Sequence, residues 1–153
     1  MRFRIAAVAM ALAVLTGALS GCATNPVTGE TDFVLVSSSQ ELAMGNEYHP
    51  NIVQMYDGEY QDPELHSYLN AIVQRIHKVS HRPEVPVEFS ILNTSIINAF
   101  ATPGHVYATR GFLAQVENEA QFASVMGHEW AHVTARHSAK QLSQSMATRA
   151  VLG

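Results

Sequence analysis

One amphipathic helix is predicted for residues 118–142, which read NEAQFASVMGHEWAHVTARHSAKQL. Asn118 is a favoured N-cap residue. Apolar side chains then recur at the three- and four-residue spacing of one helix face, at Phe122, Met126, Trp130 and Val133. The pattern predicts a helix from Glu119 to about Leu142, with this apolar stripe turned toward a hydrophobic core.

The predicted helix contains His128-Glu129-Trp130-Ala131-His132, the pattern HExxH. Residues four apart lie on one helix face, one turn up, so both imidazoles can reach one metal ion, and zinc suits such a pair. Glu129 lies beside them, where a carboxylate can take a proton from metal-bound water. The sequence therefore predicts His128 and His132 as zinc ligands and Glu129 as the catalytic base, on a flank at the edge of the core. A helix with a solvated His/Glu/His face is the alternative interpretation.

A third protein ligand is usual in a catalytic zinc site, which keeps one further position open. No Asp, Glu or Cys follows His132, and Ala135 and Ser138 stand where the metzincin pattern requires Gly and His. On a continuous helix His137 projects about 140° away from His132 and could share its ion only if the helix broke, so we expect it to cap or pack near the helix end. The site therefore either uses two histidines or is completed beyond Gly153, and the second is expected.

Two further helices are predicted upstream of this one. Ser38 and Glu41 have the spacing of a capping box, which would open a helix that runs to about Tyr56. Asp62 is a favoured N-cap residue and Pro63 suits the first helical position. The apolar residues that follow recur at helical spacing and predict the second helix.

A small β element is predicted over residues 86–110. Residues 87–91 alternate between apolar and polar, as in a half-buried strand, and two more extended segments are expected near 96–101 and 106–109. A short helix is predicted over 111–116. The predicted fold class is therefore α+β and mainly helical, with a small β element.

Residues 1–21 are predicted to be a lipoprotein signal peptide. Arg2 and Arg4 precede an apolar run over 5–15, which is shorter than the roughly 20 residues that a transmembrane helix needs. A buried anchor helix is the alternative. Residues 22–37, with their turn-forming Asn25-Pro26 pair, are expected to be a lipidated tether.

The end of this segment, Leu19-Ser20-Gly21-Cys22, resembles the bacterial lipobox, in which cleavage before the cysteine precedes its lipidation. Cys22 is the chain's only cysteine. The resemblance implies an exported protein that is anchored to the membrane through lipid on Cys22. Ala23 after the cysteine implies sorting to the outer membrane.

The length and the charge of the chain limit the number of domains and the classes of protein to which it can belong. The chain has 153 residues, about one domain on a length prior of roughly 150 residues. Charged residues make up 14% and the net charge is −4, which excludes a strongly acidic disordered tail and a basic nucleic-acid binder. No nucleic-acid partner is expected.

With these motifs, the chain resembles the HExxH zinc metallopeptidase family of HtpX, the CAAX prenyl protease and the periplasmic BepA- and LoiP-like proteases, and its lipoprotein branch in particular. The resemblance is carried by four segments, at residues 25–29, 98–104, 109–113 and 127–133. It implies a zincin, gluzincin-like fold with zinc (Zn2+) on His128 and His132, water activated by Glu129, and a downstream glutamate as third ligand. Residues 38–153 are then expected to be the N-terminal part of a metallopeptidase domain that is incomplete at its C-terminus.

One position departs from the family pattern, because Pro103-Gly104-His105 stands where the family usually has Pro-Gly-Gly. If the strand there pairs with a substrate backbone, His105 would place a side chain where none is usual and alter the cleft. An ordinary packing role in the hairpin is the alternative.

The resemblance implies an exported, membrane-anchored zinc metalloendopeptidase at the periplasmic face of the outer membrane. Its expected partners are unfolded or misassembled envelope proteins as substrates, the membrane, and the outer-membrane assembly machinery. One alternative is an outer-membrane assembly or chaperone-like lipoprotein that uses the zinc fold mainly for binding. Another is a structural or adhesin-type lipoprotein with a chance HExxH. No sequence feature separates proteolysis from assembly.

Overall fold

The computed structural model describes residues 22–152, and the predicted signal peptide lies outside them. The chain is α+β and mainly helical, as predicted. Its elements are β1 (Cys22–Thr24), β2 (Thr31–Phe33), α2 (Ser38–Met55), α3 (Pro63–Lys78), β3 (Glu88–Leu92), β4 (Ala99–Thr102), β5 (His105–Thr109), α4 (Arg110–Leu113), α5 (Glu119–Thr134) and α6 (His137–Leu152). None of the described helices combines the length and the apolar character needed to cross a bilayer.

The three-stranded sheet has the order β3-β5-β4, with β5 parallel to β3 and antiparallel to β4. The prediction that β3 is half-buried is wrong, because only Glu88 of this strand is exposed. Ser90, which suggested a solvent-facing side, is buried and donates a hydrogen bond to Glu59 Oε1 at 2.8 Å. Glu59 also pairs with the end of β3, so a loop covers this side of the strand.

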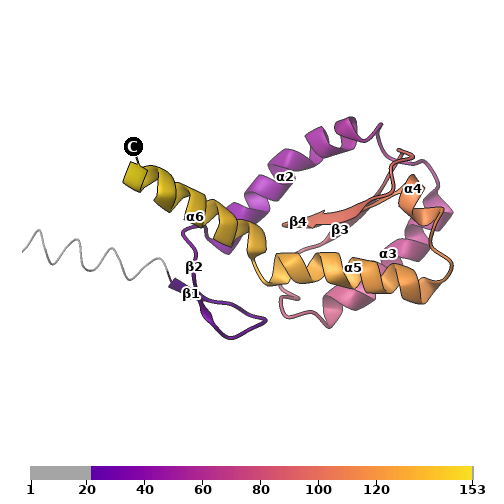
Figure 1. Ribbon diagram of the computed structural model, residues 1–153. Helices are drawn as coiled ribbons and strands as arrows, with labels where there is room; N and C mark the ends of the chain where they lie inside the picture. The colour runs from indigo at the N-terminus through magenta and orange to yellow at the C-terminus, as the bar shows by residue number, and fades with distance from the viewer. Residues whose placement is uncertain (1–21, 153) are drawn as a thin grey trace, which may run out of the picture.

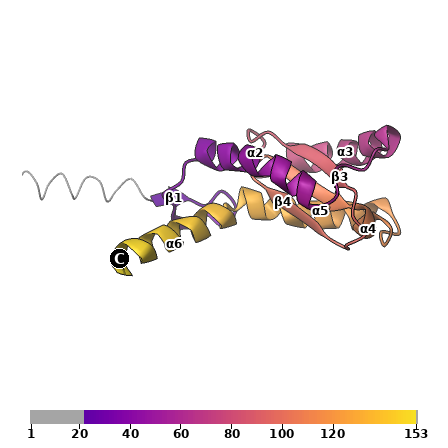
Figure 2. The ribbon, with the colours of Figure 1, turned by 90° about the horizontal axis from the view of Figure 1, so that it is seen from above.

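The main core lies between one face of the sheet and the helices α3 and α5 (Figure 2). The predicted apolar stripe of α5 is confirmed, since its members are all buried. Phe122 meets Phe89 of β3 edge to face, with ring centroids 6.0 Å apart. The fully packed members of this core are Leu69, Ile72, Val73, Val85, Phe89, Ile91, Val106, Ala108, Phe122, Met126, Trp130 and Val133. The core therefore fixes the side of α5 that faces inward.

Helix α2 lies on the opposite side of the sheet from α5 (Figure 1). It approaches the sheet closely at Gly45, where a Cβ atom would lie 1.8 Å from the carbonyl oxygen of Pro103. Beside this contact, His49 of α2 stacks on His105 with ring centroids 4.3 Å apart, and its Nδ1 lies 3.0 Å from Tyr107 Oη. The layer between α2 and the sheet is therefore polar and aromatic, unlike the apolar layer under α5.

The N-terminus of α2 is capped one residue earlier than predicted. Ser37, and not Ser38, accepts a hydrogen bond from the backbone N–H of Gln40, and the Gln40 side chain accepts one from the backbone N–H of Ser37. Glu41 was predicted to complete this capping box. It is instead buried, and its Oε2 accepts a hydrogen bond from Arg136 Nε at 2.9 Å. The cap shifted because Glu41 has a charged partner elsewhere.

The starts of α3 and α5 follow the predictions. Asp62 accepts a hydrogen bond from the backbone N–H of Leu65 at 3.0 Å, and Pro63 occupies the first helical position. Asn118 accepts one from the backbone N–H of Gln121, also at 3.0 Å. Both caps satisfy backbone donors that have no partner inside the helix.

The segment 22–37, expected to be a tether, contains the β1–β2 hairpin. The Asn25 side chain donates hydrogen bonds to Asp32 Oδ2 at 3.0 Å and to the carbonyl oxygen of Ala135 at 3.3 Å. Lys140 of α6 contacts Asp32 at 2.6 Å, and the hydrogen bonds from Lys140 and Asn25 lower the pKa of Asp32. These contacts hold the hairpin against the junction between α5 and α6.

Candidate metal centre

The predicted ligands His128 and His132 lie one turn apart on the exposed flank of α5. Their Nε2 atoms are 3.2 Å apart, and their rings are nearly perpendicular at 85°. Glu129, the predicted base, follows His128 and is half-buried. Since the apolar stripe of α5 is turned into the core, the three side chains lie at its edge, as the helical spacing predicted.

The distance between the two Nε2 atoms fits a tetrahedral metal ion. Zinc binds imidazole nitrogen at about 2.0–2.1 Å, so two ligands at a tetrahedral angle are roughly 3.3 Å apart. The observed separation of 3.2 Å is close to this value. Within residues 22–152, no group of three or more His, Cys, Asp or Glu side chains is arranged to hold one ion. Among the described residues, His128 and His132 could therefore supply two ligands to one tetrahedral ion.

The single helix predicted over 119–142 is two helices in the structure. α5 ends at Thr134, Arg136 adopts a left-handed φ of 58°, and α6 begins at His137. A non-glycine residue in this conformation costs about 1 kcal/mol or more. The prediction was wrong because no glycine or proline marks the break, and contacts from distant parts of the chain stabilise it.

A buried ionic cluster stabilises the break. Arg136 donates a hydrogen bond from Nε to Glu41 Oε2 of α2 at 2.9 Å. Arg82, from the loop after α3, lies 3.6 Å from the same carboxylate oxygen and donates to the carbonyl oxygen of Val133 at 3.3 Å. The Glu41 and Arg82 side chains are 6% and 7% exposed. Sequence reasoning missed this cluster, because its members are far apart in the chain and no local pattern relates them.

The break returns His137 to the side of α5 that carries the motif. Its Nδ1 atom lies 2.7 Å from His132 Nδ1, so the prediction that it projects away from His132 is wrong. His128 and His137 contact different nitrogens of the His132 ring. His137 is thus a neighbour of a predicted ligand, and the geometry does not make it a third ligand to the same ion.

The edge strand β4 lies against α5. Such a strand presents backbone N–H and C=O groups with which an extended peptide can pair. His105, at the start of the neighbouring strand β5, was expected to alter a cleft here. It is instead buried under α2, with Nε2 2.9 Å from Asn46 Oδ1, which is the packing alternative.

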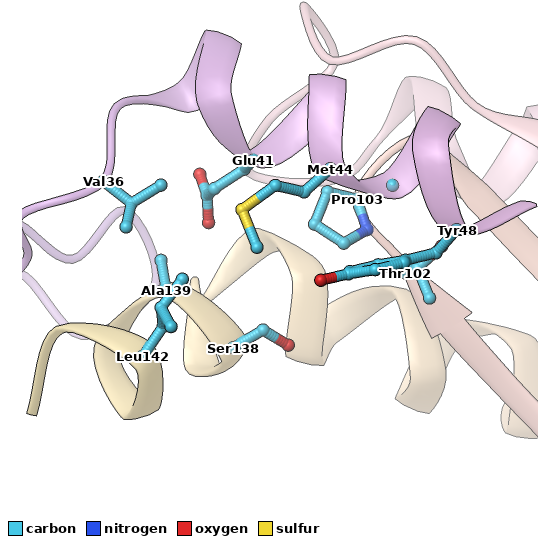
Figure 3. Close-up of a pocket in the computed structure, with 10 residues that line it drawn as sticks. Val36, Glu41, Met44, Tyr48, Thr102, Pro103, Ser138, Ala139 and Leu142 are labelled. Carbon is cyan, nitrogen blue, oxygen red and sulfur yellow. The ribbon is translucent and has the colours of Figure 1, made fainter. Parts of the chain in front are cut away.

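An apolar cavity of about 140 Å³ lies between α2, α6 and the turn that follows β4. Figure 3 shows Met44 and Tyr48 of α2 on one side and Ser138 and Leu142 of α6 on the other. Thr102, the last residue of β4, lines the same cavity. The cavity therefore extends from Thr102, at the end of the edge strand β4, to Ser138, the residue after His137.

Sequence comparison relates the chain to a family of peptidases. The sequence profile of peptidase family M48 matches residues 63–152, from the start of α3 to the end of α6. The beta-barrel assembly-enhancing protease of Escherichia coli is 34% identical over 123 residues, 78% of this chain and 24% of that protein. The corresponding protein of Yersinia pestis is 32% identical over 120 residues. The mitochondrial metalloendopeptidase OMA1 of Schizosaccharomyces pombe is 28% identical over 131 residues, 83% of this chain and 39% of that protein.

Proposed function

Because the chain belongs to peptidase family M48, we propose that it is a zinc-dependent metalloendopeptidase, with His128 and His132 as zinc ligands and Glu129 as general base. The observation that carries the proposal is the 3.2 Å separation of the two Nε2 atoms, which suits one tetrahedral ion. The chain spans 24% of the length of the Escherichia coli relative, so activity, substrate and partners of the whole protein are part of the proposal.

The reaction needs a base and an acid beside the scissile peptide bond. Bound zinc would supply Lewis acidity and a water of pKa about 7. Glu129 takes the proton from the attacking water and then gives it to the leaving amine, so the carboxylate is regenerated. The half-buried position of Glu129 next to His128 suits this role.

The edge strand β4 is the proposed binding place for the substrate backbone. An extended segment can add to it by main-chain hydrogen bonds, which depend little on sequence. The apolar cavity at Thr102 suits an apolar substrate side chain. Unfolded or misassembled envelope proteins expose both extended backbone and apolar side chains, and we propose them as the substrate class.

The proposed site of action is the cell envelope, at the periplasmic face of the outer membrane, with an anchor of lipid on Cys22. The support is the order of Arg2 and Arg4, the apolar run and Leu19-Ser20-Gly21-Cys22, together with relatives named for β-barrel assembly. In cells fed labelled palmitate, the parent should be labelled and Cys22→Ala should not. Labelling that persists in the variant would remove the lipoprotein proposal.

Replacement of the base tests the enzymatic proposal. In the full-length protein, which would include the third ligand expected beyond Gly153, Glu129→Gln keeps the size of the side chain but cannot accept the proton, so cleavage of an unfolded envelope protein should fall by about 10² to 10⁴ while zinc content is retained. His128→Ala and His132→Ala should lose both zinc and cleavage. Glu117→Gln, an exposed carboxylate just before α5, is the matched control and should cleave like the parent.

An assembly role is the second candidate, because the name of the bacterial relatives joins assembly with proteolysis. The two roles separate in the same experiment. If Glu129→Gln cleaves near the parent rate, the peptidase mechanism fails. If Glu129→Gln loses cleavage but still supports outer-membrane protein assembly in cells, binding is the dominant role.

A further inference from the structure

We infer that His137 is a positioning residue for the proposed ligand His132: it accepts the Nδ1 proton of His132 and thereby leaves His132 Nε2 free to bind the metal. The inference rests on the proposed function and deepens it. Its basis is the 2.7 Å contact between the two Nδ1 atoms, made across the break between α5 and α6.

The direction of this hydrogen bond follows from the chemistry of the ring. A neutral imidazole has one N–H donor and one nitrogen lone pair. His132 Nε2 is the atom that faces His128 Nε2, at 3.2 Å, so a metal shared by the two residues needs the lone pair on Nε2. The proton of neutral His132 must then be on Nδ1, where His137 Nδ1 is placed to accept it.

The opposite direction would prevent metal binding. If His137 Nδ1 donated to His132 Nδ1, a neutral His132 would have its proton on Nε2, the atom that must bind the ion. A ligand histidine in proteins almost always donates its second ring N–H to a fixed acceptor, which sets both the tautomer and the ring orientation. His137 is the acceptor that the structure provides to His132.

The fold provides this contact only through the helix break. On a continuous helix, five residues of separation would turn His137 about 140° away from His132. Arg136 adopts its left-handed conformation with its guanidinium bonded to the buried Glu41 carboxylate, and the chain then places His137 at the start of α6. His137 is not itself a proposed ligand. The helix break nevertheless places its Nδ1 against His132 Nδ1, the ring nitrogen that would not bind the ion.

Two substitutions at His137 distinguish the loss of the hydrogen-bond acceptor from the change in side-chain shape. His137→Leu removes the acceptor, whereas His137→Asn retains one, since Asn Oδ1 can occupy the place of the ring Nδ1. His81→Leu, an exposed histidine in the loop after α3, is the matched control. Zinc affinity is measured by chelator competition, the Co²⁺ absorption spectrum reports ligand geometry, and the thermal midpoint of the metal-free protein reports folding.

His137→Leu should weaken zinc binding by about 10- to 100-fold and change the Co²⁺ spectrum, as loss of an outer-shell partner does. His137→Asn should restore most of the affinity, and His81→Leu should bind like the parent. All four proteins should have similar metal-free midpoints, because His137 is exposed. Equal zinc affinity in the parent and His137→Leu would overturn the inference.

The tautomer of His132 gives a second readout that needs no metal. In ¹⁵N-labelled, metal-free protein at about pH 8, above the usual imidazole titration range, His132 should carry its proton on Nδ1 in the parent and in His137→Asn. His137→Leu should lose this preference. A parent His132 protonated on Nε2 would overturn the inference, whereas a full-length parent protein that shows the Nδ1 tautomer but binds no zinc would overturn the proposed function instead.

Discussion

His105 is a buried histidine whose environment opposes its protonation. Its side chain is 5% exposed, and its Nδ1 has no hydrogen-bond partner among the residues that the structure describes. Burial lowers the pKa of His105, and the neighbouring His49 lowers it further, while Glu88 of β3, 3.7 Å away, acts in the opposite direction. The neutral form is therefore the one that the native packing favours.

This environment predicts a pH dependence of stability. The unfolded chain takes up a proton on His105 near pH 6.5, whereas the folded protein does so only at lower pH. The free energy of unfolding should therefore fall as the pH drops below about 6.5, until the folded pKa is reached. His105→Gln should reduce this slope in urea titrations at several pH values.

His81→Gln is the matched control for this experiment. His81 is exposed and lies outside the packed layer between α2 and the sheet, so this variant controls for the replacement of a histidine by glutamine as such. An identical slope in the parent and His105→Gln would contradict the assignment.

At the scale of elements, two helical glycines have opposite surroundings. Gly45 of α2 lies against the backbone of Pro103, whereas the nearest atom to a Cβ at Gly127 of α5 would be Ile76 Cγ2, at 3.9 Å. Only at Gly45 does the close approach of two elements require a residue that has no Cβ atom.

We therefore expect Gly45→Ala and Gly127→Ala to change stability in opposite directions. A Cβ at Gly45 must push α2 away from the turn after β4, which should cost about 2 kcal/mol or more of unfolding free energy. At Gly127 it meets ordinary contacts and raises helix propensity, a gain of about 0.5–1 kcal/mol. Chemical denaturation of both variants measures the difference. A neutral Gly45→Ala would show that α2 can pack further from the sheet.

On the scale of the whole molecule, the Glu41 carboxylate joins three distant parts of the chain. It contacts Arg136 at the junction of α5 and α6 and Arg82 after α3, while itself lying on α2. Without the Glu41 carboxylate, Arg136 would lose its carboxylate partner, and Arg82 would keep only the exposed Glu84, 3.5 Å away.

Glu41→Gln should therefore lower the free energy of unfolding by about 3 kcal/mol. The control is Glu119→Gln, which removes the exposed ion pair with Arg75, whose side chain is 68% exposed; such a pair contributes about 1 kcal/mol or less. Urea midpoints of the two variants and the parent make the comparison. If Glu41→Gln and Glu119→Gln lose the same unfolding free energy, the buried Glu41 cluster contributes no more to stability than an exposed ion pair does.

The elements of this fold were predictable to the extent that their signals are local. The caps at Asp62 and Asn118 and the apolar stripe of α5 depend on residues three or four apart, and all are as predicted. The family resemblance was likewise drawn from short motifs, and the family match over 63–152 confirms it. The capping box at Ser38 failed by one residue because Glu41 is used in a contact far along the chain.

The place of His128 and His132 on one helix face at the edge of a core was predictable from the sequence, because helical periodicity and the apolar stripe are properties of neighbouring residues. The end of that helix depends on contacts between distant parts of the chain. The left-handed turn at Arg136 has no local signal and is stabilised by Glu41, 95 residues away in the chain. The contact of His137 with His132 depends on that turn, so it could be found only once the distant carboxylate was in place.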